Sequence, residues 1–438
     1  MRIFFINILM MLSFNASFAQ QTSFKFDFGL GKTAKNSIRI LPETRFEDGK
    51  KYGFDFGSNV VAVNHVGKNA LTRDGVKSEK PFYFSVAVPE GNYLVTVTLG
   101  DKKEPTSTTV KAESRRLMLE NVITKGGQFL TKSFIVNIKN RNITGGQVVS
   151  LKPRELTKLD WDDKLTLEFD GKTALAALEI KKVENQITVF LAGNSTVVNQ
   201  EDEPWASWGQ MIPRFFKPGV AIANHAESGL TLGSFIGSKR LTKVISVMKP
   251  GDYLFVEFGH NDQKDRGLND GAYKSYTERL KIFIAEAKKK GGIPVIVTST
   301  SRRSFDSTGK VQNTLGDFPE AARKVAKDEN VALIDLNAMT AQLFNALGEE
   351  QSKKALVHYP ANSYPGQDKP LADNTHFNPY GAYEIAQCVI LGIQDQKLGL
   401  MKFLVDDLPK FNPSTPDDPS VWKWPESPRS SLVKPDGN

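Results

Sequence analysis

The apolar residues of this chain change their spacing near residue 185, and that change limits what the chain can fold into. Between Thr22 and about Glu184, short runs rich in β-branched and aromatic residues alternate with turn residues. After Gln186, continuous apolar runs alternate with segments of helical spacing. One core does not serve both patterns, and 438 residues are enough for two cores, so we predict two domains.

The amino-terminal part has the pattern of a β-sandwich over residues 22–184. Turn chemistry at Pro89-Glu90-Gly91-Asn92 and at Asp170-Gly171 separates its runs, and no helical period is found before Glu184. The expected strands are Phe24–Phe28, Phe82–Val88, Tyr93–Leu99, Phe134–Ile138, Leu165–Phe169 and Ala174–Ile180.

Residues 186–400 have the pattern of a three-layer α/β/α domain whose parallel sheet is buried on both faces. A helical period through Tyr276 and Leu280 ends at Gly291-Gly292, and Asn378-Pro379 predicts the start of a helix through Ala382 to Leu391. Residues 401–438 are rich in proline and charge and predict an irregular strap or tail. The expected strands are Ile187–Ala192, Val220–Asn224, Tyr253–Phe258, Ile293–Ser299 and Val331–Asp335.

Residues 1–19 have the pattern of a signal peptide. Arg2 is followed by an almost wholly apolar run from Ile3 to Phe14, and Ser17-Phe18-Ala19 offers small residues for cleavage. We therefore expect an exported bacterial protein, periplasmic or extracellular. No later run approaches the roughly 20 apolar residues that a membrane-spanning helix needs, so no membrane insertion is expected. The single cysteine, Cys388, permits no intrachain disulfide.

The chain is basic, with 57 lysine and arginine residues against 49 aspartate and glutamate residues and a formal net charge of +8. Such a surface attracts polyanions in general and does not choose between acidic polysaccharide and nucleic acid. The densest basic run, Lys288-Lys289-Lys290, is typical of the last turn of a helix. We therefore expect no nucleic acid partner, and the pattern assigns no oligomeric state.

Candidate site residues follow the first three expected strands of the parallel sheet. Ser195, in Gly193-Asn194-Ser195-Thr196, lies in a strand-to-helix turn that can expose a nucleophilic hydroxyl, although the same residues also suit a helix cap. Gly229 and Asn261 follow the second and third strands. A loop glycine and a neutral amide are candidate donors to an oxyanion, whereas the alternative is a turn glycine and a helix cap.

A fourth motif, Asp373-Asn374-Thr375-His376, places a carboxylate three residues before an imidazole. In a loop, this spacing lets Asp373 hold one ring nitrogen of His376 while the other nitrogen reaches a serine hydroxyl. Metal binding by His225, His260 and His376 is the alternative, but the chain has no His-x-x-x-His pair and no cysteine cluster. The histidines without a carboxylate at this spacing, or in less suitable positions, are His65, His225, His260 and His358, and we expect a structural role for His260.

Taken in order, these motifs resemble the four sequence blocks of the SGNH (GDSL-like) hydrolases: Gly-Asp-Ser, a glycine, Gly-x-Asn-Asp and Asp-x-x-His. The resemblance covers about residues 187–391 and implies a flavodoxin-like fold and a serine esterase with no metal or organic cofactor. It implies a catalytic triad of Ser195, Asp373 and His376. It also implies that the oxyanion donors are the Ser195 N–H, the Gly229 N–H and the Asn261 side chain.

Within that superfamily, the chain looks most like the rhamnogalacturonan acetylesterases of carbohydrate esterase family twelve. This implies an acetylated polysaccharide or oligosaccharide of plant cell walls, such as pectin, as the substrate. Asn194 stands where that family usually has Asp, which implies altered electrostatics in the turn, and Leu230 stands where many members have Arg, which implies a less cationic entrance. Arg302 and Arg303 are candidate contacts for a uronic acid carboxylate, although solvated loop arginines give the same pattern. The supporting stretches are Ala192–Val197, Trp208–Met211, Asn224–Ala226, Gly259–Gln263, Ser301–Phe305 and Gly316–Ala321.

The sandwich resembles the galactose-binding-like domains that precede glycan-active domains in secreted bacterial enzymes. Tyr52, Phe54 and Phe56 alternate as the core residues of a strand do, so we expect them in the core and not in a sugar site. Two alternatives to a carbohydrate esterase remain. One is a lipase or thioesterase of the same superfamily, against which the chain shows no long apolar lid segment. The other is a glycan-binding protein with impaired catalysis, against which the intact triad residues argue.

Overall fold

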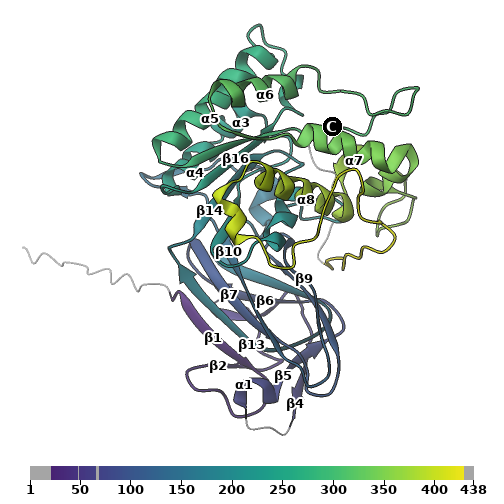
Figure 1. The fold of residues 1–438 in the computed structure, drawn as a ribbon. Helices are drawn as coiled ribbons and strands as arrows, with labels where there is room; N and C mark the ends of the chain where they lie inside the picture. Colours follow the sequence, from purple (N-terminus) through teal and green to yellow (C-terminus); the bar gives the residue numbers. More distant parts are fainter. Residues whose placement is uncertain (1–20, 48, 66–68, 429–438) are drawn as a thin grey trace, which may run out of the picture.

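The computed structural model describes residues 21–47, 49–65 and 69–428, which form a β-rich domain and an α/β domain in contact with each other (Figure 1). The expected signal peptide, residues 1–19, lies outside the described residues. Within the described ranges, no helix is both long enough and apolar enough to cross a membrane.

In the β-rich domain, two main sheets joined through one shared strand enclose an apolar core, and two short strands form a third sheet. Phe54 lies in this core and Tyr52 packs against it, but Phe56 has a positive φ and is 40% exposed, so its expected core position is wrong. Among its described residues, the domain also has the short α-helix α1 (Ala70–Arg73) and a turn of 3-10 helix, Pro153–Thr157. The strands are β1 (Ser23–Phe28), β2 (Ile38–Ile40), β3 (Tyr52–Asp55), β4 (Val61–Asn64), β5 (Asp74–Ser78), β6 (Phe82–Ala87), β7 (Gly91–Leu99), β8 (Thr106–Ala112), β9 (Arg116–Thr124), β10 (Leu130–Ile138), β11 (Asn142–Ile143), β12 (Gln147–Val148) and β13 (Lys164–Val183).

Strand β13 corrects one expectation. The sequence predicts two strands separated by a turn at Asp170-Gly171, but residues 164–183 form one continuous strand. Its first half pairs with β6 and β8, and its second half pairs with β1, β5 and β7. Gly171 has a φ of +86°, a conformation that glycine adopts at little cost, so the strand bends from one sheet into the other without ending.

The α/β domain has a five-stranded sheet in the order β15-β14-β16-β17-β18, with every neighbouring pair parallel. Numbered along the chain this order is 2-1-3-4-5, which is the flavodoxin-like order, so the expected fold class is confirmed. All five expected strands are present. Their bounds are β14 (Ile187–Gly193), β15 (Val220–Asn224), β16 (Tyr253–Phe258), β17 (Ile293–Thr298) and β18 (Ala332–Ile334).

Helices cover both faces of this sheet because its strands are apolar on both sides. One apolar cluster includes residues of α2 (Trp208–Met211), α7 (Leu336–Gln351) and α8 (Pro379–Asp395). The cluster on the other face includes residues of α3 (Leu232–Gly237), α4 (Arg240–Val247), α5 (Thr277–Lys289) and α6 (Phe318–Asp328). The expected cap of α8 is confirmed, since Asn378 Oδ1 accepts a hydrogen bond from the Gly381 N–H at 3.0 Å.

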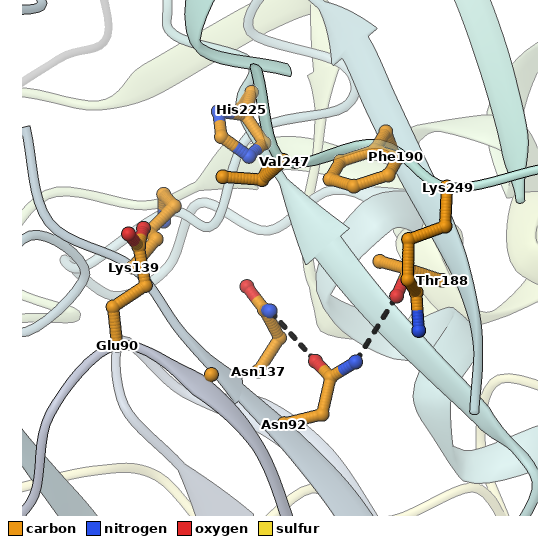
Figure 2. Close-up of a pocket in the computed structure, with 10 residues that line it drawn as sticks. Glu90, Asn92, Asn137, Lys139, Thr188, Phe190, His225, Val247 and Lys249 are labelled. Atoms are coloured by element: carbon orange, nitrogen blue, oxygen red, sulfur yellow. Dashed lines mark hydrogen bonds between the residues drawn. The ribbon is translucent and has the colours of Figure 1, made fainter. Parts of the chain in front are cut away.

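The two domains meet across polar contacts around a cavity of about 250 Å³ (Figure 2). Asn92 of β7 lies between Asn137 of β10 and Thr188 of β14; it accepts a hydrogen bond from Asn137 at 2.8 Å and donates one to Thr188 at 3.0 Å. His225 and Phe190 of the α/β domain line the same cavity. Leu117 of β9 is fully buried in an apolar cluster of the α/β domain, so the domains share core packing as well as polar contacts.

The segment after α8 runs back along the α/β domain toward the sandwich, in yellow in Figure 1. It includes one turn of 3-10 helix, Gly399–Phe403, and then has no regular element through residue 428. Near its end, the buried Lys111 of β8 donates to the Pro425 carbonyl at 2.6 Å and to the Ser427 hydroxyl at 2.9 Å. The segment therefore contacts both domains.

Candidate active site

Ser195 lies in the turn that follows β14, at the carboxyl edge of the parallel sheet. Its hydroxyl oxygen is 2.8 Å from His376 Nε2. The carbonyl of Ser195 accepts a hydrogen bond from Gln200 Nε2 at 2.8 Å, which fixes the backbone of the turn. The serine is therefore held as a hydrogen-bonded partner of an imidazole, an arrangement that a simple helix cap does not need.

Asp373 and His376 lie in β20 (Leu371–Phe377), which pairs with β19 (Leu356–Tyr359), so the expectation of a loop at this motif is wrong. The pairing passes from Ala372 to Phe377 and omits the residues between them. There the chain curls around the carboxylate, because Asp373 Oδ1 accepts hydrogen bonds from the N–H groups of Thr375 and His376 at 2.9 and 3.0 Å. The curl brings together two side chains that a regular strand would point to opposite faces.

The second carboxylate oxygen of Asp373 is 2.8 Å from Nδ1 of His376. Burial alone would raise the pKa of Asp373, but hydrogen bonds and the charge of His376, with the two N–H groups, hold that pKa below its usual range. An ionised carboxylate on Nδ1 places the proton there and leaves Nε2 to accept the proton of the Ser195 hydroxyl. The structure thus brings the three expected residues into one hydrogen-bonded chain.

A buried carboxylate that the sequence reading missed lies beneath the serine turn. Glu257, near the end of β16, accepts hydrogen bonds from Thr196 Oγ1 at 2.7 Å and from Trp208 Nε1 at 2.5 Å. Burial raises the pKa of Glu257 to about 7, although these two donors lower it. A charged residue inside an apolar strand, directly before Phe258-Gly259, is the signal that would have found it.

Asn194 continues this network on the other side of Thr196. Its side-chain oxygen accepts hydrogen bonds from the Thr196 N–H at 3.1 Å and from Thr196 Oγ1 at 3.0 Å. Its buried amide nitrogen has no hydrogen-bond partner among the described residues. The neutral amide therefore keeps the turn closed, and the only carboxylate that bonds Thr196 in this network is Glu257.

The two expected oxyanion donors other than Ser195 lie in neighbouring loops. Gly229 has a φ of +78° in the loop after β15, and Asn261 opens a short 3-10 helix after β16 without capping it by a side-chain bond. One proton of the Asn261 amide goes to the Leu230 carbonyl at 3.1 Å, which ties the two loops together. The amide keeps a second proton with which it can donate.

Residues of the sandwich domain hold the loop that contains Gly229, and the sequence reading missed this contact. The carboxylate of Glu227 accepts hydrogen bonds from Arg154 at 2.6 Å and from Lys158 at 3.0 Å. The Ser228 carbonyl accepts from Lys152 at 2.7 Å and from Arg154 at 3.0 Å. These partners are separated from the loop by 69 to 76 residues in sequence, so no local sequence pattern indicates the contact.

Three further expectations meet different outcomes. Leu230 is buried in the apolar cluster that contains α3, so its own side chain does not line an entrance, and the less cationic entrance that it implies stays a prediction. Arg303 is buried, and its guanidinium donates hydrogen bonds to Ser352 Oγ at 3.0 Å, to Asn374 Oδ1 at 3.0 Å and to the Glu349 carbonyl. Arg302 is half-buried, with contacts of 3.4 Å to the carbonyls of Thr314 and His260. Arg303 is thus bonded to Asn374, the neighbour of Asp373 in β20, while Arg302 makes only long contacts.

The remaining histidines are held in protein contacts. His260 Nε2 is 2.8 Å from the Thr300 carbonyl, and burial lowers its pKa to about 3. Burial likewise lowers the pKa of His225, whose ring packs between Trp161 and Phe190. In the described part of the chain, no group of three or more His, Cys, Asp or Glu side chains is arranged to hold a metal ion.

Comparison with known proteins gives matches to both domains. Residues 191–382 match the GDSL-like Lipase/Acylhydrolase family, and residues 24–148 match the family described as Beta-agarase/YXIM esterase-like, galactose-binding domain-like. The chain is 41% identical over 225 residues to the rhamnogalacturonan acetylesterase RhgT of Bacillus subtilis (strain 168), covering 51% of this chain and 96% of that protein.

A second relative aligns over both domains. The chain is 28% identical over 366 residues to the Uncharacterized esterase YxiM of Bacillus subtilis (strain 168), covering 79% of this chain and 88% of that protein. The crystal structure of YxiM aligns with 86% of this chain and 99% of its own, at 24% identity and a TM-score of 0.45.

Proposed function

Because this chain belongs to the GDSL-like lipase/acylhydrolase family and is a serine ester hydrolase, we propose that Ser195, His376 and Asp373 are its catalytic triad. The observation that carries the proposal is the continuous chain of two 2.8 Å contacts from the Ser195 hydroxyl through the imidazole to Asp373. The ester that we propose is an O-acetyl group on a plant cell-wall polysaccharide, and the polysaccharide is rhamnogalacturonan.

In the first half of the proposed reaction, the hydroxyl oxygen of Ser195 attacks the acetyl carbonyl carbon while His376 Nε2 takes the hydroxyl proton. The electron pair of the carbonyl bond moves to its oxygen. The N–H groups of Ser195 and Gly229 and the side chain of Asn261 stabilise that oxyanion. When the tetrahedral intermediate collapses, His376 gives the proton to the departing sugar oxygen and an acetyl-Ser195 ester remains.

In the second half, His376 Nε2 takes a proton from water, and the resulting hydroxide adds to the acetyl carbon at the same oxyanion donors. Collapse returns the proton from His376 to Ser195 Oγ and releases acetic acid, which loses its proton to water and becomes acetate. His376 carries the proton of each transfer to or from Ser195, the sugar oxygen and the attacking water, and Asp373 stabilises the imidazolium that forms in each half. The neutral Asn261 amide suits this cycle, because it binds the oxyanion without forming a permanent ion pair with it.

The proposed substrate is supported by the named activity of one relative. The protein that shares 41% identity over the α/β domain is a rhamnogalacturonan acetylesterase. Arg302, half-buried and held only by long contacts, is the proposed contact for a uronic acid carboxylate of the glycan. Arg303 is not proposed as such a contact, because its nitrogens already bond protein acceptors.

The proposal also assigns a role to each part of the chain. Residues 1–19 direct export, residues 22–184 form an accessory domain and residues 186–400 form the catalytic domain. A secreted enzyme meets polymeric cell-wall glycans, which do not enter a cell. The gap between β13, which ends at Val183, and β14, which starts at Ile187, supports a boundary near residue 185.

The test compares wild-type protein with Ser195→Ala and with Ser78→Ala as a matched control. The Ser78 hydroxyl also donates one hydrogen bond, to the Lys80 carbonyl at 2.8 Å, but in the sandwich domain. Each protein is incubated with p-nitrophenyl acetate, acetylated rhamnogalacturonan and acetylated xylan, and released nitrophenol or acetate is measured. We expect only Ser195→Ala to lose activity, and rhamnogalacturonan to be the preferred polymer.

Each part of the proposal has its own contrary result. Equal rates for wild type and Ser195→Ala would overturn the triad. Turnover of the small ester with no acetate from either polymer would leave an esterase and remove the glycan, in favour of a lipase or thioesterase. Absence of turnover in the wild type, together with binding of the glycan, would indicate a binding protein.

A further inference from the structure

We propose that Lys152 and Arg154 of the sandwich domain are positioning residues for the oxyanion hole of the α/β domain. They bind one end of the peptide group whose other end is the Gly229 N–H. The inference rests on the proposed function, because it concerns how that N–H is aimed and polarised. It gives the sandwich domain a part in catalysis that does not require the domain to bind carbohydrate.

The backbone around Gly229 is a tight turn. The Leu230 N–H donates to the Glu227 carbonyl at 3.2 Å, and the positive φ of Gly229 is the conformation that the third position of a type II turn requires. The central peptide group of the turn, between Ser228 and Gly229, takes no part in this hydrogen bond, so its C=O and its N–H can both bond to groups outside the turn. In a trans peptide the C=O and the N–H point in opposite directions, so whatever fixes the Ser228 carbonyl also fixes the direction of the Gly229 N–H.

Two cations hold the Ser228 carbonyl. Lys152 Nζ donates to it at 2.7 Å and Arg154 Nη2 at 3.0 Å, both from the segment that joins β12 to β13. The Gly229 N–H, at the other end of the same peptide, donates to no other described residue. Positive charge at the carbonyl oxygen draws electron density toward it and makes the N–H of that peptide a stronger donor. The donor is thereby left for an acceptor in the active site.

The segment that carries these cations is itself fixed on the α/β domain. Arg154 and Lys158 both bond the buried carboxylate of Glu227, the first residue of the turn. Between them in sequence, the buried Glu155 bonds Arg240 of α4. The turn and its cationic partners are thus held from both sides, and a donor held in advance needs no reorganisation when the oxyanion forms.

Lys152 and Arg154 place positive charge at the Ser228 carbonyl. A water molecule or a neutral side chain would satisfy a carbonyl that needed only a hydrogen bond. Positive charge behind the donor favours a negative oxygen in front of it, and the reaction creates that charge only in its tetrahedral states.

The test uses the full-length protein and p-nitrophenyl acetate, a neutral ester whose binding a lysine does not assist by charge. The variants are Lys152→Met, Lys152→Arg, Arg154→Met, and the control Lys164→Met, which removes a sandwich cation paired with Asp55 at 3.1 Å. For Lys152→Met we expect kcat and kcat/KM to fall together by roughly ten- to a hundred-fold, less than for complete loss of an oxyanion donor. We expect Lys152→Arg to keep most of the rate and Lys164→Met to keep all of it.

A second measurement separates this role from a merely structural one. Phenylboronic acid adds to the serine hydroxyl as a tetrahedral anion, so its Ki should rise by the same factor by which kcat/KM falls. The comparison of Lys152→Met with Lys152→Arg is decisive, because arginine keeps a charged donor for the Ser228 carbonyl, whereas Arg154→Met also removes a partner of Glu227 and can reduce stability for that reason alone. Thermal unfolding of each variant shows whether the fold is retained.

The inference is overturned if Lys152→Met keeps its fold, its kcat and its Ki, or if only KM changes. The proposed function fails in a different way, because Ser195→Ala would then hydrolyse the ester as fast as the wild type, and no variant near Ser228 would matter. An inactive Ser195→Ala with a fully active Lys152→Met therefore removes the inference alone.

Discussion

Glu155 of the sandwich and Arg240 of the α/β domain form an ion pair in which both side chains are almost completely buried, with 0% and 1% of their surface exposed. One oxygen of Glu155 is 2.7 Å from Arg240 Nη2 and the other is 2.5 Å from it. Arg240 also donates to the carbonyl of His225 at 3.1 Å. This pair joins the domains where no solvent can replace either partner.

Removal of one partner of this pair should destabilise the protein strongly. Glu155→Leu leaves the Arg240 guanidinium buried without its carboxylate, which costs about 3–5 kcal/mol. We expect a clearly lower urea midpoint for Glu155→Leu, and recovery of part of the loss in Glu155→Leu with Arg240→Met. The control is Lys324→Met, which breaks an exposed pair with Asp328 and should change the midpoint little. A single variant as stable as the wild type would contradict this.

Asp373→Asn should reduce kcat by about 10⁴ while the fold is retained. The side-chain oxygen of the new Asn remains on the N–H groups of Thr375 and His376, so its amide nitrogen turns toward Nδ1 of His376. Nδ1 must then accept, and the ring proton moves to Nε2, where it prevents uptake of the serine proton. Steady-state rates on p-nitrophenyl acetate and thermal unfolding check this. A variant within tenfold of the wild-type kcat would show that Asp373 does not set the tautomer.

Glu257 should make the free energy of unfolding fall as the pH rises. Burial raises its pKa to about 7 from 4.5, so the native state holds this proton more tightly than the unfolded chain does. Its contribution is complete below about pH 4.5 and is lost as the pH rises to about 7, an amount of at most about 3 kcal/mol.

Glu257→Gln isolates that contribution. The amide oxygen can still accept from Trp208, and the amide N–H can donate to Thr196 Oγ1, but the side chain cannot ionise. We expect urea midpoints equal to the wild type at pH 4 and higher than the wild type at pH 8. The other carboxyl groups with raised pKa values, such as Asp262, are unchanged in both proteins and cancel in the difference. The opposite order at pH 8 would show that Glu257 is ionised in the native state.

Removal of the sandwich should disable the α/β domain. A chain that starts at Gln186 exposes the apolar cluster into which Leu117 packs and loses the cations at Ser228. We expect an insoluble product, or a soluble one with at most a tenth of the wild-type kcat on p-nitrophenyl acetate, an estimate that follows from the cost of a weakened oxyanion donor. A soluble fragment with full kcat would show that the sandwich is only an attachment.

Much of the α/β domain could be predicted from sequence because its signals are local. The five parallel strands are buried on both faces and therefore appear as continuous apolar runs, and Asn378-Pro379 gives both a cap and a first-turn proline. The order of Ser195, Gly229 and Asn261 behind separate strands predicts a common edge of the sheet, and the structure places all three in loops after those strands. The Asp373–His376 motif lies instead within β20 of a two-stranded sheet, from which His376 reaches Ser195.

The rest depends on contacts that no local pattern carries. Gly171 has the same signature in a turn and in a strand that bends between sheets, so β13 was divided in two. The pairing of Arg154 with Glu227 joins residues 73 positions apart in two different domains, so it depends on how the domains pack together. Leu230 shows the converse, since a comparison of residue types at one position does not tell whether its side chain faces the entrance or the core.

Lys111 has a consequence for how the chain assembles during synthesis. Its ammonium group is buried beside Glu168 and Asp170, at 3.2 and 3.3 Å, and it also binds Pro425 and Ser427, more than 310 residues later. Domains generally fold as they leave the ribosome, the amino-terminal one first. We therefore expect the sandwich to form its sheets before Pro425 and Ser427 are made, with this lysine and its two acids open to water until those residues bind it. In that order, the last described part of the chain to be made completes a domain that was made first.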